Sequence, residues 1–563
     1  MGQIRMALEQ NLDKDLLYLK NKLLRHQFSD IKEKEEKEGL SVQCIFDGKE
    51  ICFILFSDIY RLPVVLIESG VDVYPHIIFE TDEYLGSKWK QICLNIQDSY
   101  ITYQMSMEEK IDLTVDKLLN LMSLSDVKIK KELEKEFSVY WQKSSKKTYL
   151  SNLSESEKSG EVRLLIPKDS KKDNSMIIVG NSYYNYEEKG YIEEVAYLIN
   201  IVDFSDIFPP CYKEWDKEMI NSIFFSLRYE RYEGKTYNIL KKIQAKEKVT
   251  ILFKLPFVKH MFIGVEFIFT VRTAEGFLKK LKSSDYEVGF IEIVNTNIEH
   301  SIVRNGDSLL NIDCVTMIGC GSLGSYIYRE LLSSNIREFI LVDGDSFSSE
   351  NLSRHILNEY YIGKNKAVGL QFYPILDKSV KVESIQKYLD RNNIIEVLKS
   401  QNSKRNLAIV TVGNEDVQHM INSHIYAKDF VPTLFCWLEA NGVGAHVLAV
   451  INKGRGCYNC IQEYKKTSDK FKYIRNNDVP LFTNGCGGSY THYGNLILLE
   501  ATSLILNVIQ SSSEGQIAEN TIFSLKAIAN SEIASTDYYN LQSERIQVNN
   551  DIYFEGCIYC GGV

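Results

Sequence analysis

The spacing of hydrophobic residues changes several times along the chain, and each change predicts a different element. Residues 1–30 carry leucines at helical spacing among charged residues, which predicts an opening amphipathic helix. Three strand-like runs follow, over residues 41–46, 50–59 and 64–67. Residues 107–122 return to a strong helical period. This order of helix, strands and helix predicts an α+β domain over residues 1–145.

The middle of the chain carries strands and helical stretches but no motif that indicates chemistry. Residues 144–160 are rich in Ser, Lys and Glu, which predicts a linker. Beyond it, strand-like runs cover residues 163–166, 176–179, 249–255 and 262–270. We therefore expect an α/β linker domain over residues 146–300, with a structural or docking role.

A glycine-rich turn between two strands marks the start of a third domain. Residues 315–318 form an apolar run that leads into Gly319, Gly321 and Gly324. A helical stretch follows over residues 325–333, and a second strand ends at Asp343. This is the βαβ fingerprint of a nucleotide site, in which glycines let a phosphate approach the backbone and a carboxylate accepts from ribose. It predicts a Rossmann-like domain over residues 301–563, whereas a glycine turn without a ligand is the simpler alternative.

Charged residues directly after this βαβ unit favour ATP over NAD. They are Asp345, Asn351, Arg354 and Lys366. Each of them alone is typical of a solvated surface. A hydride-transfer site needs a flat apolar pocket, whereas nucleotidyl transfer needs cations beside the phosphates, where negative charge develops. Together these residues favour an ATP site.

The overall composition limits the classes of protein and of partner. With 44% hydrophobic and 25% charged residues, the chain is not fully disordered or fibrous. Its formal net charge of −10 does not predict a nucleic-acid partner. The first residues lack the apolar core of a signal peptide, and the apolar stretch 496–509 contains Glu500, which favours a buried helix over a membrane span. We expect a soluble, cytoplasmic protein with no membrane partner.

Two C-x-x-C pairs predict a metal site. Cys457 and Cys460 form the first pair, and Cys557 and Cys560 form the second, close to the end of the sequence. Four thiolates satisfy a closed tetrahedral Zn²⁺ site, and a tight C-x-x-C turn presents two sulfur atoms to one ion. Redox-active pairs or buried core thiols are the alternatives.

Two further cysteines are candidate nucleophiles. Cys486 lies between glycines, shortly before the long apolar helix expected from Asn495, and this setting is typical of an exposed, reactive thiol. Cys93 stands in Ile-Cys-Leu, after a segment that contains Pro75 and His76 and before the helix over residues 107–122. The simpler alternatives are a small loop residue for Cys486 and a packed thiol for Cys93.

The segment from Asp313 onward resembles the ThiF/MoeB/ubiquitin-activating adenylyltransferase superfamily. The resemblance implies that ATP and Mg²⁺ adenylate a C-terminal carboxylate. It makes the three glycines the phosphate loop and Asp343 the ribose ligand, and it places Asn351, Arg354 and Lys366 around the triphosphate. It also implies that Cys486 takes the activated acyl group as a thioester, and that the four paired cysteines hold a structural Zn²⁺.

One position departs from the pattern of that superfamily. An acidic residue after the fourth strand usually helps to bind Mg²⁺, but Gly413 occupies its place here. Asn414, Glu415 and Asp416 follow directly and are the candidates to replace it.

The N-terminal part resembles the core of ubiquitin-conjugating enzymes, in which a Pro/His element precedes the cysteine of an Ile-Cys-Leu run. Here the order is Pro75-His76 rather than His-Pro, and the usual Asn after it is missing. The combination resembles the ubiquitin-activating/conjugating fusion of bacterial CBASS anti-phage operons. That family implies a homodimer in which an acyl group passes from Cys486 to Cys93 and then to a target amine. The implied donor is the C-terminal tail of a CD-NTase, a cGAS-like cyclase.

Three alternatives remain open at this point. A simpler adenylyltransferase would activate a sulfur-carrier-like or ubiquitin-like protein without conjugation, and the N-terminal half would then be a docking module. A non-catalytic scaffold that binds nucleotide is supported by Gly413. An NAD-dependent oxidoreductase is the third, and it would bind NAD instead of ATP.

Overall fold

The computed structural model of the chain describes residues 2–36, 39–56, 58, 61–68, 75–77, 88–94, 105–168, 176–179, 191–201, 216–218, 220–221, 236–245, 247–255, 261–269, 275–282, 286–373, 380–399, 405–428, 430–479, 482–484, 488–528 and 531–561. The chain divides into two units, which are described separately. The first covers most of residues 1–296, and the second covers most of residues 297–563.

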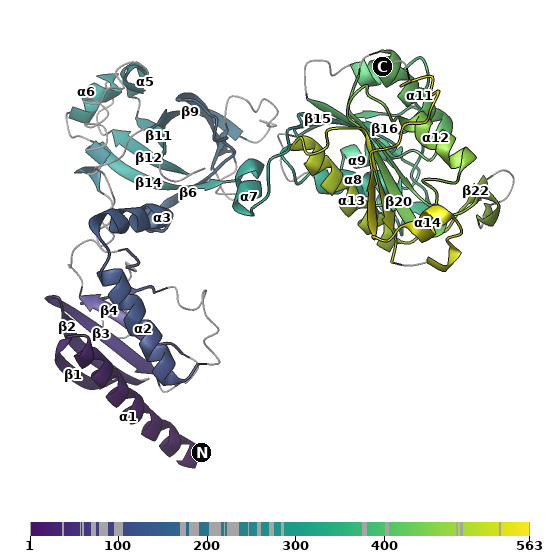
Figure 1. The fold of residues 1–563 in the computed structure, drawn as a ribbon. Helices are drawn as coiled ribbons and strands as arrows, with labels where there is room; N and C mark the ends of the chain where they lie inside the picture. Colours follow the sequence, from purple (N-terminus) through teal and green to yellow (C-terminus); the bar gives the residue numbers. More distant parts are fainter. Residues whose placement is uncertain are drawn as a thin grey trace. The chain divides into compact units, whose positions relative to one another are not determined.

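The first unit begins with a helix and an antiparallel sheet (Figure 1). The elements are α1 (Gly2–Arg25), β1 (Ser29–Glu36), β2 (Gly39–Phe46), β3 (Lys49–Phe56), β4 (Val64–Glu68), β5 (Trp89–Ile92), α2 (Met107–Met122) and α3 (Asp126–Ser144). The strands pair in chain order, β1-β2-β3-β4-β5, and each pair is antiparallel. Leu19 of α1, Phe53 of β3 and Val115 of α2 are fully buried in one core. The sheet therefore buries one face under the helices, as the hydrophobic pattern predicts.

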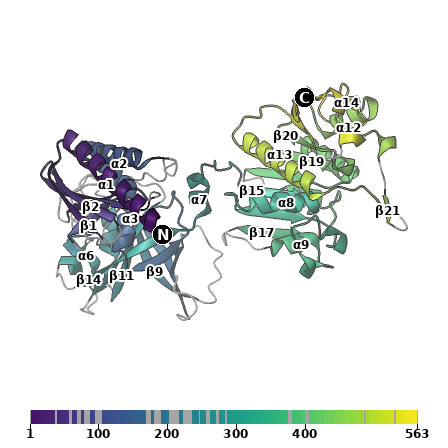
Figure 2. The same cartoon turned by 90° about the horizontal axis from the view of Figure 1, so that it is seen from below.

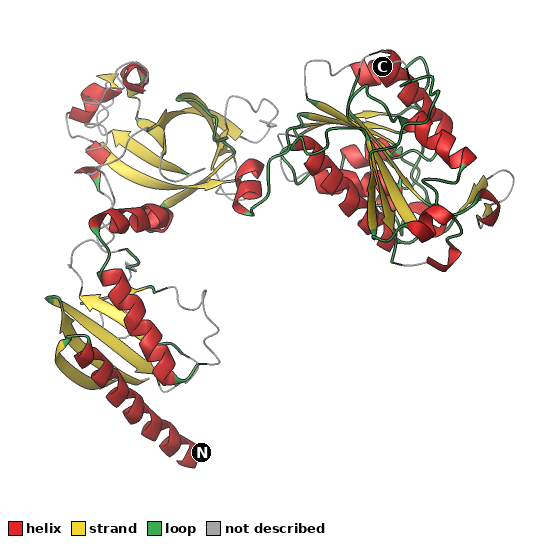
Figure 3. Ribbon diagram, viewed as in Figure 1, coloured by secondary structure: helices red, strands yellow, loops and turns green. Residues whose placement is uncertain are grey.

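A closed barrel follows in the same unit (Figure 3). Its strands are β6 (Lys147–Ser151), β7 (Gly160–Pro167), β8 (Met176–Val179), β9 (Tyr191–Asn200), β11 (Lys248–Lys254), β12 (Phe262–Phe269) and β14 (Tyr286–Asn295). Short elements flank it: α5 (Thr236–Lys242), β10 (Gln244–Ala245), β13 (Glu275–Gly276) and α6 (Phe277–Lys282). The indole N–H of Trp141 in α3 donates to the carbonyl of Ile291 in β14 (2.8 Å), which joins the helix to the barrel wall.

The second unit is built on one sheet. Its helices and strands are α7 (Ile298–Arg304), β15 (Cys314–Ile318), α8 (Ser322–Leu331), β16 (Glu338–Val342), α9 (Lys366–Gln371), β17 (Lys381–Ile385), α10 (Ile394–Lys399), β18 (Asn406–Val410), α11 (Glu415–Ala427), β19 (Thr433–Leu438), β20 (Gly444–Val450), α12 (Tyr458–Thr467), β21 (Phe482–Asn484), β22 (Gly488–Tyr490), α13 (Asn495–Ser513), β23 (Thr521–Lys526), α14 (Asp537–Leu541) and β24 (Ile546–Asn549).

The order of this eight-stranded sheet is β17-β16-β15-β18-β19-β20-β23-β24. The first five strands are parallel, and β20, β23 and β24 are antiparallel additions. The chain therefore reverses its direction of travel across the sheet between β15 and β18, the position where doubly wound folds bind ligands.

Helices cover both faces of this sheet. Residues of α8, α9 and α13 share one core with Val315 and Met317 of β15, and residues of α10, α11 and α12 share another with Ile318. Figure 2 shows α8 and α13 side by side. Among the helices that the structure describes, α13 alone has the length and hydropathy of a membrane span. It buries Ala501 and Ile505 in the core of the second unit, as expected for residues 496–509.

Most predicted elements are present with shifted ends, but the predicted linker is wrong. Residues 147–151 form β6, one of the strands of the barrel, and Tyr149 and Ser151 of this strand are buried. The next strand, β7, already begins at residue 160. The polar residues that predicted a linker lie partly in β6 itself, where Lys147 and Thr148 are exposed, and partly in the turn before β7. The strand predicted over residues 176–179 has the same bounds as β8.

Candidate functional site

A cavity of about 360 Å³ lies at the carboxyl ends of the parallel strands in the second unit. Its walls come from the segments that follow β15, β16, β17 and β18, and they include Gly319, Gly321, Asp343, Lys366 and Gly413. The structure thus brings together Gly319, Gly321, Asp343 and Lys366, four residues that the sequence predicted as nucleotide ligands. Apolar side chains of Leu389, Val412 and Val417 line the same cavity, so it offers both an apolar and a charged wall.

The shape of the glycine loop requires residues without a Cβ at two of its positions. Gly319 has a φ of +100°, a region that L side chains rarely adopt. A Cβ on Gly324 would lie 2.2 Å from the Gly319 carbonyl oxygen, so α8 packs directly on the loop. A Cβ on Gly321, by contrast, would meet nothing within 4 Å. Gly319 and Gly324 therefore shape the loop, whereas Gly321 leaves space at the start of α8, where no side chain caps the helix.

Asp343 binds the glycine loop through its carboxylate. The N–H of Cys320 donates to Asp343 Oδ2 (2.7 Å), and the N–H of Asp345 donates to Oδ1 (2.7 Å). Burial raises the pKa of Asp343, and these two hydrogen bonds oppose the rise. Each carboxylate oxygen has two lone-pair sites, so both can still accept a ribose hydroxyl.

Lys366 pairs with an acidic residue that also lines the cavity. Its Nζ lies 3.0 Å from Asp345 Oδ2, while the hydroxyl of Tyr388 donates to Oδ1 (2.8 Å). Burial alone would raise the pKa of Asp345, but the hydrogen bonds from Tyr388 and Lys366 lower it below its usual value. Asp345 is therefore ionised and holds the ammonium group against the cavity wall.

Gly413 leaves open space at the position where the superfamily pattern has an acid. A Cβ there would meet nothing within 4 Å. Asn414 caps α11 by accepting from the N–H of Val417 (3.2 Å), and Glu415 and Asp416 lie in the first turn of that helix. Asn414 is the one of these three candidates that lines the cavity.

Asn351 and Arg354 do not line this cavity. The Asn351 side chain is buried and accepts from the N–H of Ser348 (3.1 Å), which fixes the turn that carries Arg354. The Arg354 guanidinium lies 4.9 Å from the ring centre of Tyr493, and its Nε is buried without a hydrogen-bond partner. The Tyr493 hydroxyl donates to Ser322 Oγ (3.3 Å) in the first turn of α8. Arg354 is thus held beside the helix N-terminus through an aromatic ring.

Sequence reasoning missed several residues that support the site. Thr411 Oγ1 donates to the Gly319 carbonyl (2.8 Å), and the His355 ring nitrogen Nε2 lies 2.9 Å from the Cys320 carbonyl. Since the N–H of Leu357 donates to His355 Nδ1 (3.1 Å), Nε2 carries the proton. Burial lowers the pKa of His355 to about 4. Tyr388 and Tyr493 were missed as well. Each of these supporting residues contacts a partner that lies far away in the sequence, which no local pattern reveals.

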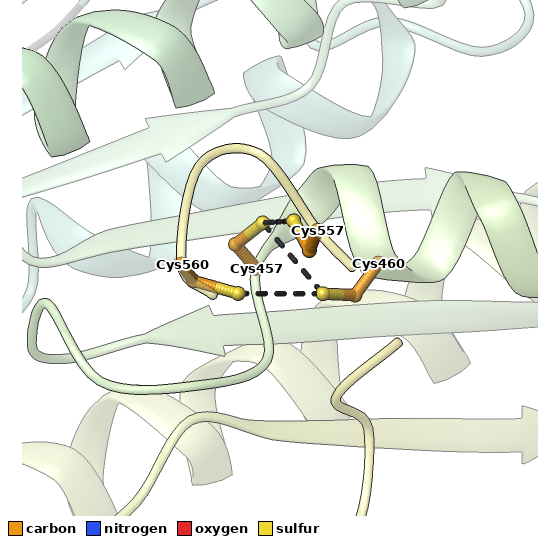
Figure 4. A group of neighbouring side chains, drawn as sticks. All are labelled: Cys457, Cys460, Cys557 and Cys560. Atoms are coloured by element: carbon orange, nitrogen blue, oxygen red, sulfur yellow. Dashed lines mark hydrogen bonds between the residues drawn. The ribbon is translucent and has the colours of Figure 1, made fainter. Parts of the chain in front are cut away.

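The four paired cysteines form one buried cluster (Figure 4). Cys457 is the N-cap residue directly before α12, Cys460 lies in the first turn of that helix, and the other pair lies in a turn near the end of the chain. The Sγ–Sγ distances are 3.9 Å for Cys457–Cys460, 3.6 Å for Cys457–Cys557 and 3.4 Å for Cys460–Cys560. A tetrahedral Zn²⁺ with Zn–S bonds of about 2.3 Å needs sulfur atoms about 3.8 Å apart. The cluster therefore fits Zn²⁺.

Amide groups complete the surroundings of these sulfur atoms. Asn422 Nδ2 lies 3.6 Å from Cys457 Sγ, and Asn459 Nδ2 lies 3.5 Å from Cys557 Sγ. Donors of this kind stabilise thiolates and orient metal ligands. Because the two pairs are about a hundred positions apart, an ion here would tie the end of the chain to α12.

Of the two candidate nucleophiles, the structure describes Cys93 but not Cys486. Cys93 follows β5, its thiol is half-buried, and its N–H donates to the carbonyl of His76 (2.7 Å). The structure thus brings the Pro75-His76 element next to Cys93. Cys486 lies outside the described residues, between the paired strands β21 and β22.

A family model described as the ThiF family matches residues 296–540, so this part of the chain is a ThiF domain. Two curated relatives are each named ATP-dependent ubiquitin transferase-like protein Cap2. The one from Vibrio cholerae serotype O1 is 23% identical over 554 residues, with 87% of this chain and 90% of the relative covered. The one from Escherichia coli strain TW11681 is 22% identical over 540 residues, with 83% and 86% covered.

Among solved structures, the crystal structure of E. coli MccB with MccA is similar to 45% of this chain. The match covers 67% of that chain, at 17% identity and a TM-score of 0.32. The family match and the two relatives confirm that the protein is an enzyme with a ThiF domain in its C-terminal half. They also confirm the predicted resemblance to ubiquitin-type transfer enzymes over most of the chain.

Proposed function

We propose that this protein, whose residues 296–540 form a ThiF domain, uses ATP to activate the C-terminal carboxylate of a protein substrate and transfers it to an amine. The observation that carries the proposal is the cavity in which Gly319, Gly321, Asp343 and Lys366 meet at the carboxyl ends of the parallel strands. A glycine turn at a helix N-terminus together with a lysine ammonium group is an arrangement that binds triphosphates, which supports the proposal.

In the first proposed step, a carboxylate oxygen of the substrate attacks the α-phosphorus of ATP. The bond to the β-phosphate breaks, pyrophosphate leaves, and an acyl-adenylate forms. Lys366 balances the charge that develops on the phosphates, and Asp343 holds the ribose. Arg354, which Tyr493 holds beside the start of α8, and Asn351, which fixes the turn that carries Arg354, are proposed to act on the leaving pyrophosphate. Mg²⁺ would supply further charge neutralisation when bound, and of the three residues that follow Gly413, Asn414 lines the cavity and would be the candidate to hold it.

Two thioester steps follow in the proposal. The Cys486 thiolate attacks the acyl carbon, a C–S bond forms, and AMP leaves with the electron pair of the broken C–O bond. The Cys93 thiolate then attacks the Cys486 thioester and releases Cys486 as a thiolate. A target amine attacks the Cys93 thioester, Cys93 leaves as a thiolate, and the amine loses its proton to solvent as the amide forms. The series of thioester steps thereby divides one difficult acyl transfer into several easier transfers.

The N-terminal domain is proposed to act as the conjugating part. The support is an antiparallel five-stranded sheet with helices on one face, in which Cys93 follows an edge strand and is bonded through its backbone to His76. The two relatives are named ubiquitin transferase-like proteins, and because their matches cover 87% and 83% of this chain, they include at least part of this domain.

Further parts of the proposal follow from the family resemblance. The carboxylate donor is the C-terminal tail of a CD-NTase of a CBASS anti-phage system, the enzyme is a cytoplasmic homodimer, and the cysteine cluster holds a structural Zn²⁺. The barrel between the two catalytic parts serves as a linker or docking domain.

An ATP–pyrophosphate exchange assay with the cyclase from the neighbouring gene, followed by non-reducing gels, tests the proposal. Exchange is expected, with two acyl adducts that a reducing agent removes. Cys93→Ala is expected to leave the first adduct and remove the second, and Cys486→Ala to remove both. Cys52→Ala, which removes a buried thiol from β3, controls for the number of thiols.

Gly413 is the observation that favours a second function, a scaffold that binds nucleotide without catalysis. Nucleotide binding without any exchange, with a cyclase shown to bind the protein, would establish the scaffold. Exchange without an adduct on Cys93 would instead reduce the protein to an adenylyltransferase.

A further inference from the structure

His76 has a backbone conformation that its neighbours must support. Its φ of +68° lies in the left-handed region, which is unfavourable for a residue with a Cβ. A non-glycine residue keeps this conformation only where surrounding contacts over-determine it, and such residues concentrate at functional sites. The contacts of His76 therefore indicate what the conformation is for.

Two side chains of α3 hold His76 in place. The backbone N–H of His76 donates to Glu136 Oε2 (2.7 Å) and also lies 3.2 Å from the hydroxyl of Tyr140. The Tyr140 hydroxyl donates to the same Glu136 oxygen, and His76 Nδ1 faces Glu136 Oε1. Burial alone would raise the pKa of Glu136, but these contacts with His76 and Tyr140 lower it, so the carboxylate is ionised.

The opposite end of the same residue fixes Cys93. The carbonyl of His76 accepts from the N–H of Cys93 (2.7 Å), and the adjacent Ile77 and Ile92 form an antiparallel bridge. Tyr140 is buried in the core under the sheet, so α3 is a rigid support for this chain of contacts. The path from Glu136 through the His76 backbone to the Cys93 backbone consists only of short hydrogen bonds.

The His76 imidazole is directed at α3. Nδ1 faces Glu136, and Nε2 lies 3.9 Å from Glu132 Oε2. Both ring nitrogens therefore face carboxylates of the same helix. The contribution of His76 to Cys93 is made by its carbonyl, whose direction the left-handed φ sets.

We propose that Glu136 and Tyr140 are positioning residues for Cys93: they hold His76 in its left-handed conformation so that the His76 carbonyl fixes the Cys93 backbone. This inference rests on the proposed function, in which Cys93 receives an acyl group. Neither residue touches the acyl group. Their effect is to keep the Cys93 thiol in one orientation for attack, and a displacement near 1 Å costs an oriented reaction about a hundredfold in rate.

The test compares Glu136→Leu with a compensating substitution at position 76. Glu136→Leu removes the carboxylate that accepts from both the His76 N–H and the Tyr140 hydroxyl, so that only the longer contact of the His76 N–H with Tyr140 remains. We expect transfer from Cys486 to Cys93 to slow by about tenfold or more. Glycine adopts a positive φ without cost, so His76→Gly added to Glu136→Leu is expected to restore much of the rate. His76→Ala added to Glu136→Leu should not restore it, because alanine pays the same steric penalty as histidine.

A second readout follows the backbone directly and needs no substrate. The Cys93 amide hydrogen is protected by the His76 carbonyl, so its hydrogen–deuterium exchange in the full-length protein reports on the contact. Exchange at Cys93 is expected to quicken in Glu136→Leu and to slow again with His76→Gly. Glu134→Leu, two positions away on α3, is the matched control and should change neither readout. ATP–pyrophosphate exchange should stay at the wild-type rate in all variants, which verifies that the ThiF domain is intact.

The outcomes separate the inference from the proposed function. If the Cys93 amide keeps its protection in Glu136→Leu, or if protection is lost while transfer continues at the wild-type rate, the positioning role is wrong. If His76→Gly abolishes transfer even where amide protection is restored, the imidazole itself is needed and the inference is overturned. If the wild-type protein never carries an acyl group on Cys93, the proposed function fails, and the inference fails with it whatever the amide exchange shows.

Discussion

Lys366 and Asp345 form an ion pair inside the nucleotide cavity, with 3.0 Å between Nζ and Oδ2. The side chain of Lys366 is only 11% exposed, whereas that of Asp345 is 52% exposed. Asp345 therefore holds the ammonium group at the wall of the cavity until a more strongly charged group arrives. A triphosphate is such a group, and the pair implies that Lys366 changes partner when ATP binds.

Removing this ammonium group is expected to reduce catalysis more than folding. Lys366→Ala should lower the kcat of ATP–pyrophosphate exchange by about a hundredfold, the usual effect of removing one group that stabilises developing charge. The matched control is Lys364→Ala, because Lys364 is exposed and packs over the ring of Tyr360 instead. A Lys366→Ala enzyme with wild-type kcat would show that Lys366 serves only to pair Asp345.

The glycines of the phosphate loop are expected to fail in different ways. Gly324→Ala places a Cβ 2.2 Å from the Gly319 carbonyl oxygen, so the loop and α8 must separate and the ThiF domain should lose stability. Gly321→Ala meets no atom within 4 Å, so the fold should keep its melting temperature while ATP affinity falls. Melting curves with and without Mg-ATP distinguish the two. Equal melting temperatures for both variants would contradict the assignment of the two roles.

Local patterns predicted much of the fold, and long-range pairing explains what they missed. The strand over residues 41–46 and the helix over 107–122 have clear hydrophobic periods, and both are present. β1 was missed because its sequence, SDIKEKEE, is charged throughout: it is an edge strand that pairs on one side only and exposes most of its side chains. The barrel could not be predicted because parallel pairs such as β14 with β6 join residues far apart in the sequence.

The same distinction applies to the site. The glycine loop and Asp343 form one continuous motif, so their proximity follows from a single βαβ unit. Tyr388 and Tyr493 have no such signature, since each contacts the site from another segment of the chain. Asn351 and Arg354, by contrast, follow the βαβ unit closely in the sequence but do not line the cavity, a placement that spacing alone does not reveal.

Removal of the metal ligands is expected to loosen the end of the chain. Cys460→Ser should reduce the zinc content of the purified protein from about one ion per chain to a small fraction, since a structural site needs all four ligands. It should also lower the melting temperature, because Cys460 and Cys560 no longer tie α12 to the terminal turn. Cys436→Ser, at a buried thiol outside the cluster, is the control for loss of a core cysteine. Full zinc content in Cys460→Ser would exclude the assigned ligand set.

Tyr493 is expected to affect ATP affinity through Arg354. Tyr493→Leu removes the ring that the guanidinium covers at 4.9 Å, and this contact is worth about 0.5–1 kcal/mol, so the Kd for Mg-ATP should rise by about two- to fivefold. Tyr493→Phe keeps the ring and loses only the hydrogen bond to Ser322, so its effect should be smaller. In Arg354→Ala, the Tyr493→Leu substitution should have no further effect beyond the share of the Ser322 hydrogen bond that Tyr493→Phe measures. Additive losses in the double variant, measured by titration calorimetry, would contradict the coupling.

The free energy of unfolding of the protein is expected to fall as the pH drops from 7 to 5, and the titration of His355 supplies a part of this fall that can be measured separately. Burial lowers the pKa of His355 to about 4, below its usual 6.5, so the folded protein keeps the ring neutral while the unfolded chain takes up a proton. The unfolded state therefore binds more protons between pH 6.5 and 4, and unfolding becomes easier as the pH falls. For these two pKa values, the loss between pH 7 and pH 5 is about 2 kcal/mol.

Comparison with His355→Gln isolates this share, because a glutamine amide can bond to the Cys320 carbonyl without titrating. Burial also lowers the pKa of His446, and that effect is common to both proteins, so it cancels in the difference. Calorimetry should follow the unfolding transition that Mg-ATP raises, at pH 7, 6 and 5. The variant is expected to be less stable than the wild type at pH 7 and to approach it at pH 5. Parallel pH profiles would mean that His355 has the same pKa in both states and that its bond to the glycine loop does not depend on a neutral ring.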